Sequence, residues 1–91
     1  MDLDSKERNR LRSVAHSLKP AVLIGKNGLT DESIENIRKA LDDHELIKVK
    51  FNAFKEEKDA LTKEILVKTG AELINQLGNT IVLYVKKTDP D

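Results

Sequence analysis

The sequence predicts a small α/β domain, a two-layer α+β arrangement in which a mixed four-stranded sheet lies under helices. Apolar residues recur at helical spacing in three segments and at strand spacing in four, in the order αβαβαββ. Helices separate the first strands, which predicts parallel crossovers, and a closing hairpin predicts an antiparallel last strand. The 91 residues make one domain, residues 1–91, with an ordered core expected over about 3–87.

The first helix is expected over residues 4–18. Asp4 and Glu7 have the spacing of a capping box, and Ser5 is an alternative cap. Pro20 stops the helix, because proline disfavours helical geometry at the residue before it. One side of this helix carries an apolar stripe, made of Leu11, Val14, Ala15 and Leu18.

A short strand is predicted at residues 21–24, followed by a loop and a second helix. The strand is wholly apolar, which is consistent with a central position covered on both faces. The loop at residues 25–28 has the pattern Gly-x-x-Gly. Thr30 is expected to cap the second helix, which should end near His44.

The remaining elements are a strand, a helix and a hairpin. Apolar residues alternate with lysines at 47–51, which indicates a half-buried strand with one polar face. A helix is predicted over about 56–68, and Gly70 suits the position after its end. The hairpin strands are expected at 71–77 and 80–85 around a tight two-residue turn, and 88–91 as a frayed tail.

The amino-acid composition limits the kinds of site that the chain is able to form. The chain has no cysteine, so a disulfide framework and a thiolate metal site are excluded, which fits a reducing cytoplasm. It has no apolar run near 18 residues and no signal peptide pattern, so no membrane association is expected. The net charge is zero, but residues 1–28 carry six basic and three acidic side chains, a net of +3. Such polarisation suits one basic face that meets a polyanion.

The Gly-x-x-Gly loop has the features of a phosphate-binding turn. Gly25 and Gly28 let the backbone turn sharply and expose N–H groups, and the following helix N-terminus adds partial positive charge. Lys26 adds a full charge, and Asn27 is able to donate to a phosphate or a 2′-hydroxyl. We therefore interpret the loop as an RNA backbone clamp, although an ordinary strand-to-helix turn has the same pattern.

Basic side chains of the first helix extend this hypothesis. At 3.6 residues per turn, Arg8 and Arg12 share one flank of the apolar stripe, and Lys6 and Arg10 lie on the other flank. Lys19 is expected near the loop, because only Pro20 and the short strand separate them. The alternative for all five side chains is a solvated helix surface.

Other polar and aromatic residues favour structural roles. His16 and His44 are expected near helix C-termini, where local hydrogen bonding explains them better than catalysis or metal binding. Lys48 and Lys50 are interpreted as a solvated strand face. Tyr84, Phe51 and Phe54 are each able to stack on a base, but Phe51 is better explained as a core residue, while the role of Tyr84 stays open. With three aromatic residues, the chain lacks a platform of interleaved stacking groups.

Several motifs together resemble the YhbY-type CRM (chloroplast RNA splicing and ribosome maturation) domain. They are residues 16–20, 24–30, 40–50 and 78–84, and the resemblance covers roughly residues 3–86. It implies a compact αβαβαββ domain similar to the C-terminal domain of bacterial initiation factor three. Single-domain members of that family are bacterial RNA-binding proteins associated with the precursor of the large ribosomal subunit, and plant relatives carry the domain within intron-splicing factors.

We therefore predict a non-enzymatic RNA-binding protein that engages precursor ribosomal RNA and assembly particles in the cytoplasm as a monomer, without metal or cofactor. An alternative is a protein-interaction module that docks on a ribosomal protein or assembly factor, suggested by the acidic second and third helices. An enzyme such as a nuclease is a third possibility, but no Cys–His, Ser–His–Asp or metal-ligand spacing supports it.

Overall fold

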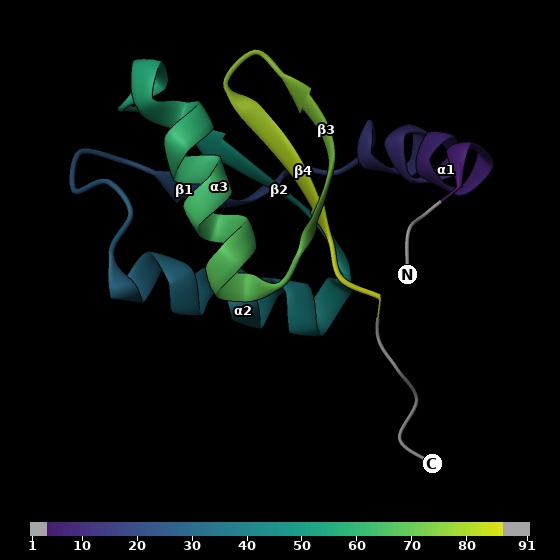
Figure 1. The fold of residues 1–91 in the computed structure, drawn as a ribbon, viewed down its shortest axis with the longest axis horizontal. Helices are drawn as coiled ribbons and strands as arrows, with labels where there is room; N and C mark the ends of the chain where they lie inside the picture. The colour runs from purple at the N-terminus through teal and green to yellow at the C-terminus, as the bar shows by residue number, and fades with distance from the viewer. Residues whose placement is uncertain (1–3, 87–91) are drawn as a thin grey trace.

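A computed structural model describes residues 4–86, which form α-helices on a four-stranded sheet (Figure 1). The elements are α1 (Ser5–Ala15), β1 (Pro20–Ile24), α2 (Asp31–His44), β2 (Leu46–Phe51), the 3₁₀ turn η1 (Lys55–Glu57), α3 (Lys58–Thr69), β3 (Glu72–Leu77) and β4 (Thr80–Tyr84). This order confirms the predicted αβαβαββ fold. The expected core limits at 3 and 87 and the predicted tail at 88–91 lie outside the described residues.

The sheet is mixed, with the strand order β1-β2-β4-β3. β1 runs parallel to β2, and β4 is antiparallel to both β2 and β3, as the crossovers and the hairpin predict. The central position expected for β1 is wrong: β1 is an edge strand, and Leu23 on it is 57% exposed. A short apolar run does not reveal its sheet neighbours, because these depend on where β4 inserts.

One face of the sheet is covered by α2 and α3 (Figure 1). Ile47, Val49 and Phe51 point to this face, as their alternation predicts, and they are buried. Ile37 of α2 and Ile65 of α3 pack against them. This is the main hydrophobic core, and it fixes the two helices on one side of the sheet.

The opposite face carries α1, a placement that the sequence does not predict. Leu11 and Ala15 are buried in a second cluster, whose sheet members are Leu46, Ile74, Val82 and Tyr84. These strand positions alternate with those of the main core, so the two clusters lie on opposite faces. Helix α1 ends at Ala15 rather than 18, and no helix within residues 4–86 has both the length and the apolar composition to cross a membrane.

Local capping explains the helix boundaries. Asp4 accepts a hydrogen bond from the Glu7 amide at 2.8 Å, and Thr30 accepts one from the Ser33 amide at 3.1 Å. Gly70 ends α3 with φ +74, in the left-handed conformation that glycine adopts without strain. These three caps are the ones that the sequence predicts.

Candidate nucleic-acid interface

The Gly-x-x-Gly loop is a tight, exposed turn at the end of β1. The Gly28 amide donates to the Gly25 carbonyl at 3.0 Å, which leaves Lys26 and Asn27 at the exposed tip. Gly28 has φ +69, a conformation that a residue with a Cβ adopts only with strain. Within residues 4–86, no hydrogen bond engages the amide of Lys26 or of Asn27. Both amides are therefore available to an anionic ligand.

Both ends of this turn are fixed by hydrogen bonds. Before the turn, the Ile24 carbonyl accepts from the Asn52 amide at 2.9 Å and from the Ala53 amide at 3.3 Å. After the turn, Thr30 caps α2, and the Ser33 hydroxyl donates to the Gly28 carbonyl at 3.5 Å. The loop is thus held between the sheet and the helix, which limits the entropy lost on binding.

A shallow polar pocket of about 260 Å³ adjoins the turn. Its lining includes Lys26, Asn27, Ser33 and Asn36, together with one acidic side chain, Glu32. The N-terminus of α2 contributes partial positive charge here, and among the described carboxylates none forms an ion pair with Lys26. The site suits a phosphate, and Glu32 moderates its attraction for one.

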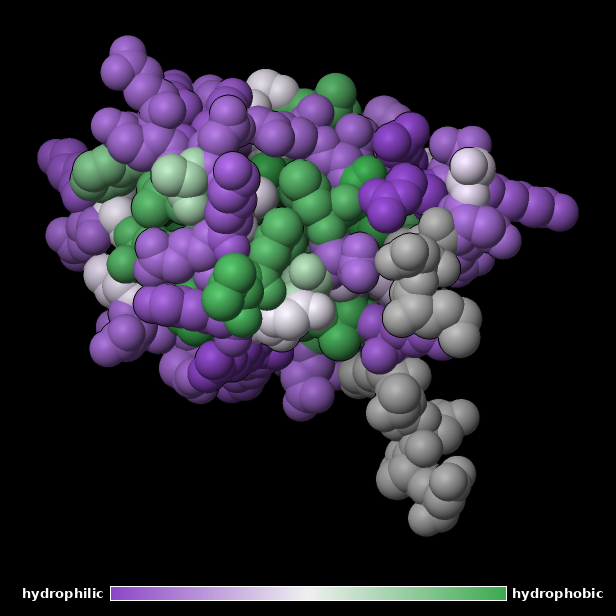
Figure 2. Space-filling model, viewed as in Figure 1, coloured by the Kyte–Doolittle hydropathy of each residue, from purple (hydrophilic) through white to green (hydrophobic). Residues whose placement is uncertain are grey.

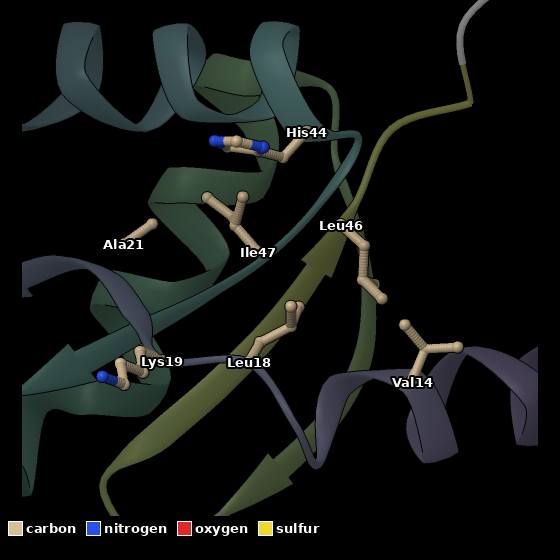
Figure 3. Close-up of a pocket in the computed structure, with 7 residues that line it drawn as sticks. All are labelled: Val14, Leu18, Lys19, Ala21, His44, Leu46 and Ile47. Carbon is tan, nitrogen blue, oxygen red and sulfur yellow. The ribbon is translucent and has the colours of Figure 1, made fainter.

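Helix α1 lies at the other end of the molecule, whose longest dimension is 39 Å (Figure 1). Arg8 and Arg12, which were expected to extend the RNA-binding surface of the loop, therefore do not lie beside it. Lys19 is also remote, because β1 is extended and about 20 Å of strand separates it from Gly25. It lines a pocket of about 400 Å³ between α1 and the end of α2 (Figure 3). The prediction that Lys19 lies near the loop is wrong because a strand is extended, whereas a helix or turn of the same length would have placed Lys19 closer to Gly25.

The arginines of α1 make contacts within the protein. Arg8 donates to the Leu73 carbonyl at 2.8 Å, and Arg12 donates to the Ile74 carbonyl at 3.4 Å, so both tie α1 to the edge strand β3. Arg10 forms an exposed ion pair with Glu7 at 2.6 Å. This hydrogen bond lowers the pKa of Glu7 below its ordinary value and raises the pKa of Arg10. Lys6 is exposed.

Two lysines lie between the loop and α1. Lys48 and Lys50 alternate with the core residues of β2, so they point to the face that carries α1. Lys50 pairs in register with Leu23, close to the loop, and Lys48 pairs with Pro20, close to Lys19. The alternation of apolar residues and lysines predicts that one face of β2 is polar. The sequence did not predict that α1 lies on the same face of the sheet, so the position of Lys48 and Lys50 between the loop and α1 was missed.

The aromatic residues divide clearly between core and surface. Phe51 is fully buried, and Tyr84 is 9% exposed beneath α1, so neither offers a free ring. Phe54, between β2 and η1, is 42% exposed. His16 and His44 lie at the C-terminal ends of α1 and α2, where they were expected.

The element order, the mixed sheet and the Gly-x-x-Gly turn between β1 and α2 define a class of small α/β domain. The chain belongs to the CRS1 / YhbY (CRM) domain family, which it matches over residues 3–84. This match confirms the resemblance that the sequence motifs indicate.

Individual relatives agree with this membership. The chain is 40% identical over 83 residues to a Haemophilus influenzae protein named RNA-binding protein, covering 90% of this chain and 84% of the relative. It is 33% identical over 92 residues to the probable RNA-binding protein PA4753 of Pseudomonas aeruginosa, covering 100% and 88%. The solution structure of the hypothetical protein SAV1595 from Staphylococcus aureus has a TM-score of 0.78 and 34% identity, over 99% of this chain and 95% of that one.

Proposed function

We propose that this protein binds RNA, with the turn Gly25–Gly28 as its main contact to the sugar-phosphate backbone. The single observation that carries the proposal is the turn itself, in which Lys26 and two unengaged amides are exposed at the N-terminus of α2. Positive charge and oriented N–H donors together favour a phosphate. The names of the relatives, which describe RNA-binding proteins, support the same ligand class.

The proposed RNA path runs from the turn along the sheet face that carries α1. Lys50 and Lys48 provide the next positive charges, followed by Lys19 near the start of β1. Lys6 and Arg10 on α1 extend the contact at the far end, whereas Arg8 and Arg12 position α1 through β3. Recognition along such a path rests on phosphate geometry and RNA shape more than on base edges.

The family resemblance supports a finer proposal. We infer that the RNA is precursor ribosomal RNA, that the protein assists assembly of the large ribosomal subunit in the cytoplasm, and that it acts as a monomeric binding protein without catalysis. This inference depends on the YhbY-type motifs and on the predicted clamp, and crosslinking of the protein to RNA in cells tests it directly.

A charge-reversal titration tests the clamp. Lys26→Glu is expected to weaken binding to structured ribosomal RNA by about tenfold or more and to lower the salt slope by roughly one to two phosphate contacts. Lys63→Glu on the exposed surface of α3 is the matched control, with the same charge change away from the turn. Equal effects of the two variants would show that only net charge matters and would remove the turn from the site.

Docking on a protein is a second candidate, supported by the surface of α3. Val67 on this helix is 84% exposed, and Figure 2 shows hydrophobic residues at the surface between hydrophilic ones on the face that α2 and α3 cover. A Val67→Glu variant that loses a ribosomal protein from nuclease-treated pull-downs, while it keeps RNA affinity, would favour this function. Unchanged recovery would argue against it.

A further inference from the structure

Phe54 is an aromatic side chain at the surface in a strained backbone conformation. It is 42% exposed and has φ +57, a left-handed geometry that costs roughly 1–2 kcal/mol for a residue with a Cβ. The other two aromatic residues of the chain are buried. Neither burial nor backbone preference therefore explains a phenylalanine at this position.

The ring of Phe54 lies directly against the Gly-x-x-Gly turn. A Cβ placed on Gly28 would meet the Cε2 atom of the ring at 3.3 Å. The segment that carries the ring is tied to the residue before the turn, because the amides of Asn52 and Ala53 both donate to the Ile24 carbonyl. The ring and the proposed phosphate clamp thus form one local unit, although 26 positions separate Gly28 from Phe54 in the sequence.

We propose that Phe54 stacks on one unpaired nucleobase of the RNA whose backbone the turn holds. This inference rests on the proposed function and makes it more specific, since a base in a continuous duplex does not offer its face to a protein ring. Stacking on aromatic side chains is a general way of holding splayed-out bases. Lys55, Glu56 and Glu57 follow Phe54 and together carry one net negative charge, so they do not favour a phosphate there and do not repel a neutral base. The ligand class is therefore RNA with an unpaired nucleotide, as in a loop or bulge.

A purely structural role for Phe54 makes different predictions. If the ring only covers Gly28, Phe54→Leu retains apolar contact and should leave RNA binding unchanged. If the ring stacks on a base, Phe54→Leu and Phe54→Gly should both weaken binding to a hairpin RNA with an unpaired loop by roughly tenfold. Phe54→Gly also relieves the left-handed strain, so it keeps the variant folded. Binding to a fully paired duplex of the same stem should change little in either variant.

Tryptophan fluorescence gives a direct readout. The chain has no tryptophan, so Phe54→Trp introduces a single reporter at the proposed stacking site. We expect the hairpin RNA to quench its fluorescence and the paired duplex to leave it nearly unchanged. Val67→Trp, at an exposed apolar position on α3, is the matched control and should not be quenched. Equal quenching at both positions, or RNA binding without quenching at position 54, would overturn the proposal.

Combining the reporter with Lys26→Glu separates the stacking role from the clamp. Loss of both binding and quenching in the combined variant supports the clamp, because RNA that does not bind cannot quench the reporter, and the stacking role is then decided by quenching in Phe54→Trp alone. Binding that depends on Lys26 but never quenches the reporter overturns the stacking role and leaves the clamp intact. Quenching that survives Lys26→Glu at full affinity supports stacking and contradicts the phosphate clamp.

Discussion

The Gly25–Gly28 turn and helix α1 lie at opposite ends of the molecule, and both carry positive charge, but the charges are used differently. Lys26 is exposed at the turn and pairs with no described carboxylate. In α1, Arg8 and Arg12 donate to carbonyls of β3, and Arg10 pairs with Glu7. A count of basic residues therefore overstates the charge that α1 offers to a ligand. The turn is expected to serve binding, and most of the α1 arginines are expected to serve stability.

The largest effect is expected from a substitution that removes the packing of α1 against the sheet. Leu11 is 3% exposed in the cluster beneath this helix. Leu11→Ala should lower the free energy of unfolding by about 2–5 kcal/mol, measured by urea denaturation, because it leaves a cavity under α1. RNA affinity measured well below the unfolding transition should fall much less than in Lys26→Glu. A collapse of affinity in the folded variant would show that α1 itself holds the RNA.

The next test compares Arg8 with Lys26 through one neutralising change. Arg8→Met removes a charge-assisted hydrogen bond to the Leu73 carbonyl and should cost about 1–2 kcal/mol of stability. Lys26→Met should change stability by less than about 0.5 kcal/mol but reduce RNA affinity. Lys63→Met, on the exposed surface of α3 and outside the proposed RNA path, provides the control. If Arg8→Met lowers RNA affinity without lowering the free energy of unfolding, Arg8 serves binding, and the inferred difference between α1 and the turn is wrong.

A smaller effect is expected from the acidic residue beside the turn. Glu32→Gln removes a negative charge from the pocket and should raise RNA affinity by roughly two- to fourfold at low salt. The same change should destabilise α2 slightly, because a carboxylate in the first turn favours the helix dipole. Asp43→Asn, near the far end of α2, is the control in the binding titration. Identical gains from both variants would point to net charge alone.

The smallest effect is a pH dependence at α1. The hydrogen bond from Arg10 holds the pKa of Glu7 below its ordinary value of 4.5, so this contact adds stability above that value. The contribution is lost as the pH falls from there through the lowered pKa. Denaturation midpoints of Glu7→Gln and the native chain should therefore differ slightly at neutral pH and converge in acid. A difference that persists in acid would separate the effect from Glu7 ionisation.

Much of the fold was predictable because its signals are local. Thr30 and Gly70 mark helix ends through their own side-chain or backbone chemistry, and the alternation of Ile47, Val49 and Phe51 identifies one face of β2. The position of β1 at the sheet edge was not predictable in this way. It follows from the pairing of β4 with β2, a contact between segments far apart in the sequence.

The candidate site was predicted in part for the same reason. The turn Gly25–Gly28 forms from adjacent residues, so its shape and exposure follow from the motif. The partners of Arg8 and Arg12 depend on which face of the sheet α1 covers, which helical periodicity does not specify. Residue type alone made Phe54 a candidate for stacking on a base, but its left-handed backbone was not predictable, because a left-handed phenylalanine runs against residue preferences. Its proximity to Gly28 emerges only from the folded chain.

The two edge strands of the sheet, β1 and β3, have a consequence for self-association. Unpaired backbone groups along an edge strand can template another chain and start a growing cross-β assembly. At β3, two carbonyls already accept hydrogen bonds from guanidinium groups, and at β1 the first residue is a proline without an N–H donor. The arginines of α1 thus leave fewer free acceptors along β3, so we expect this edge to pair poorly with a strand of a second chain.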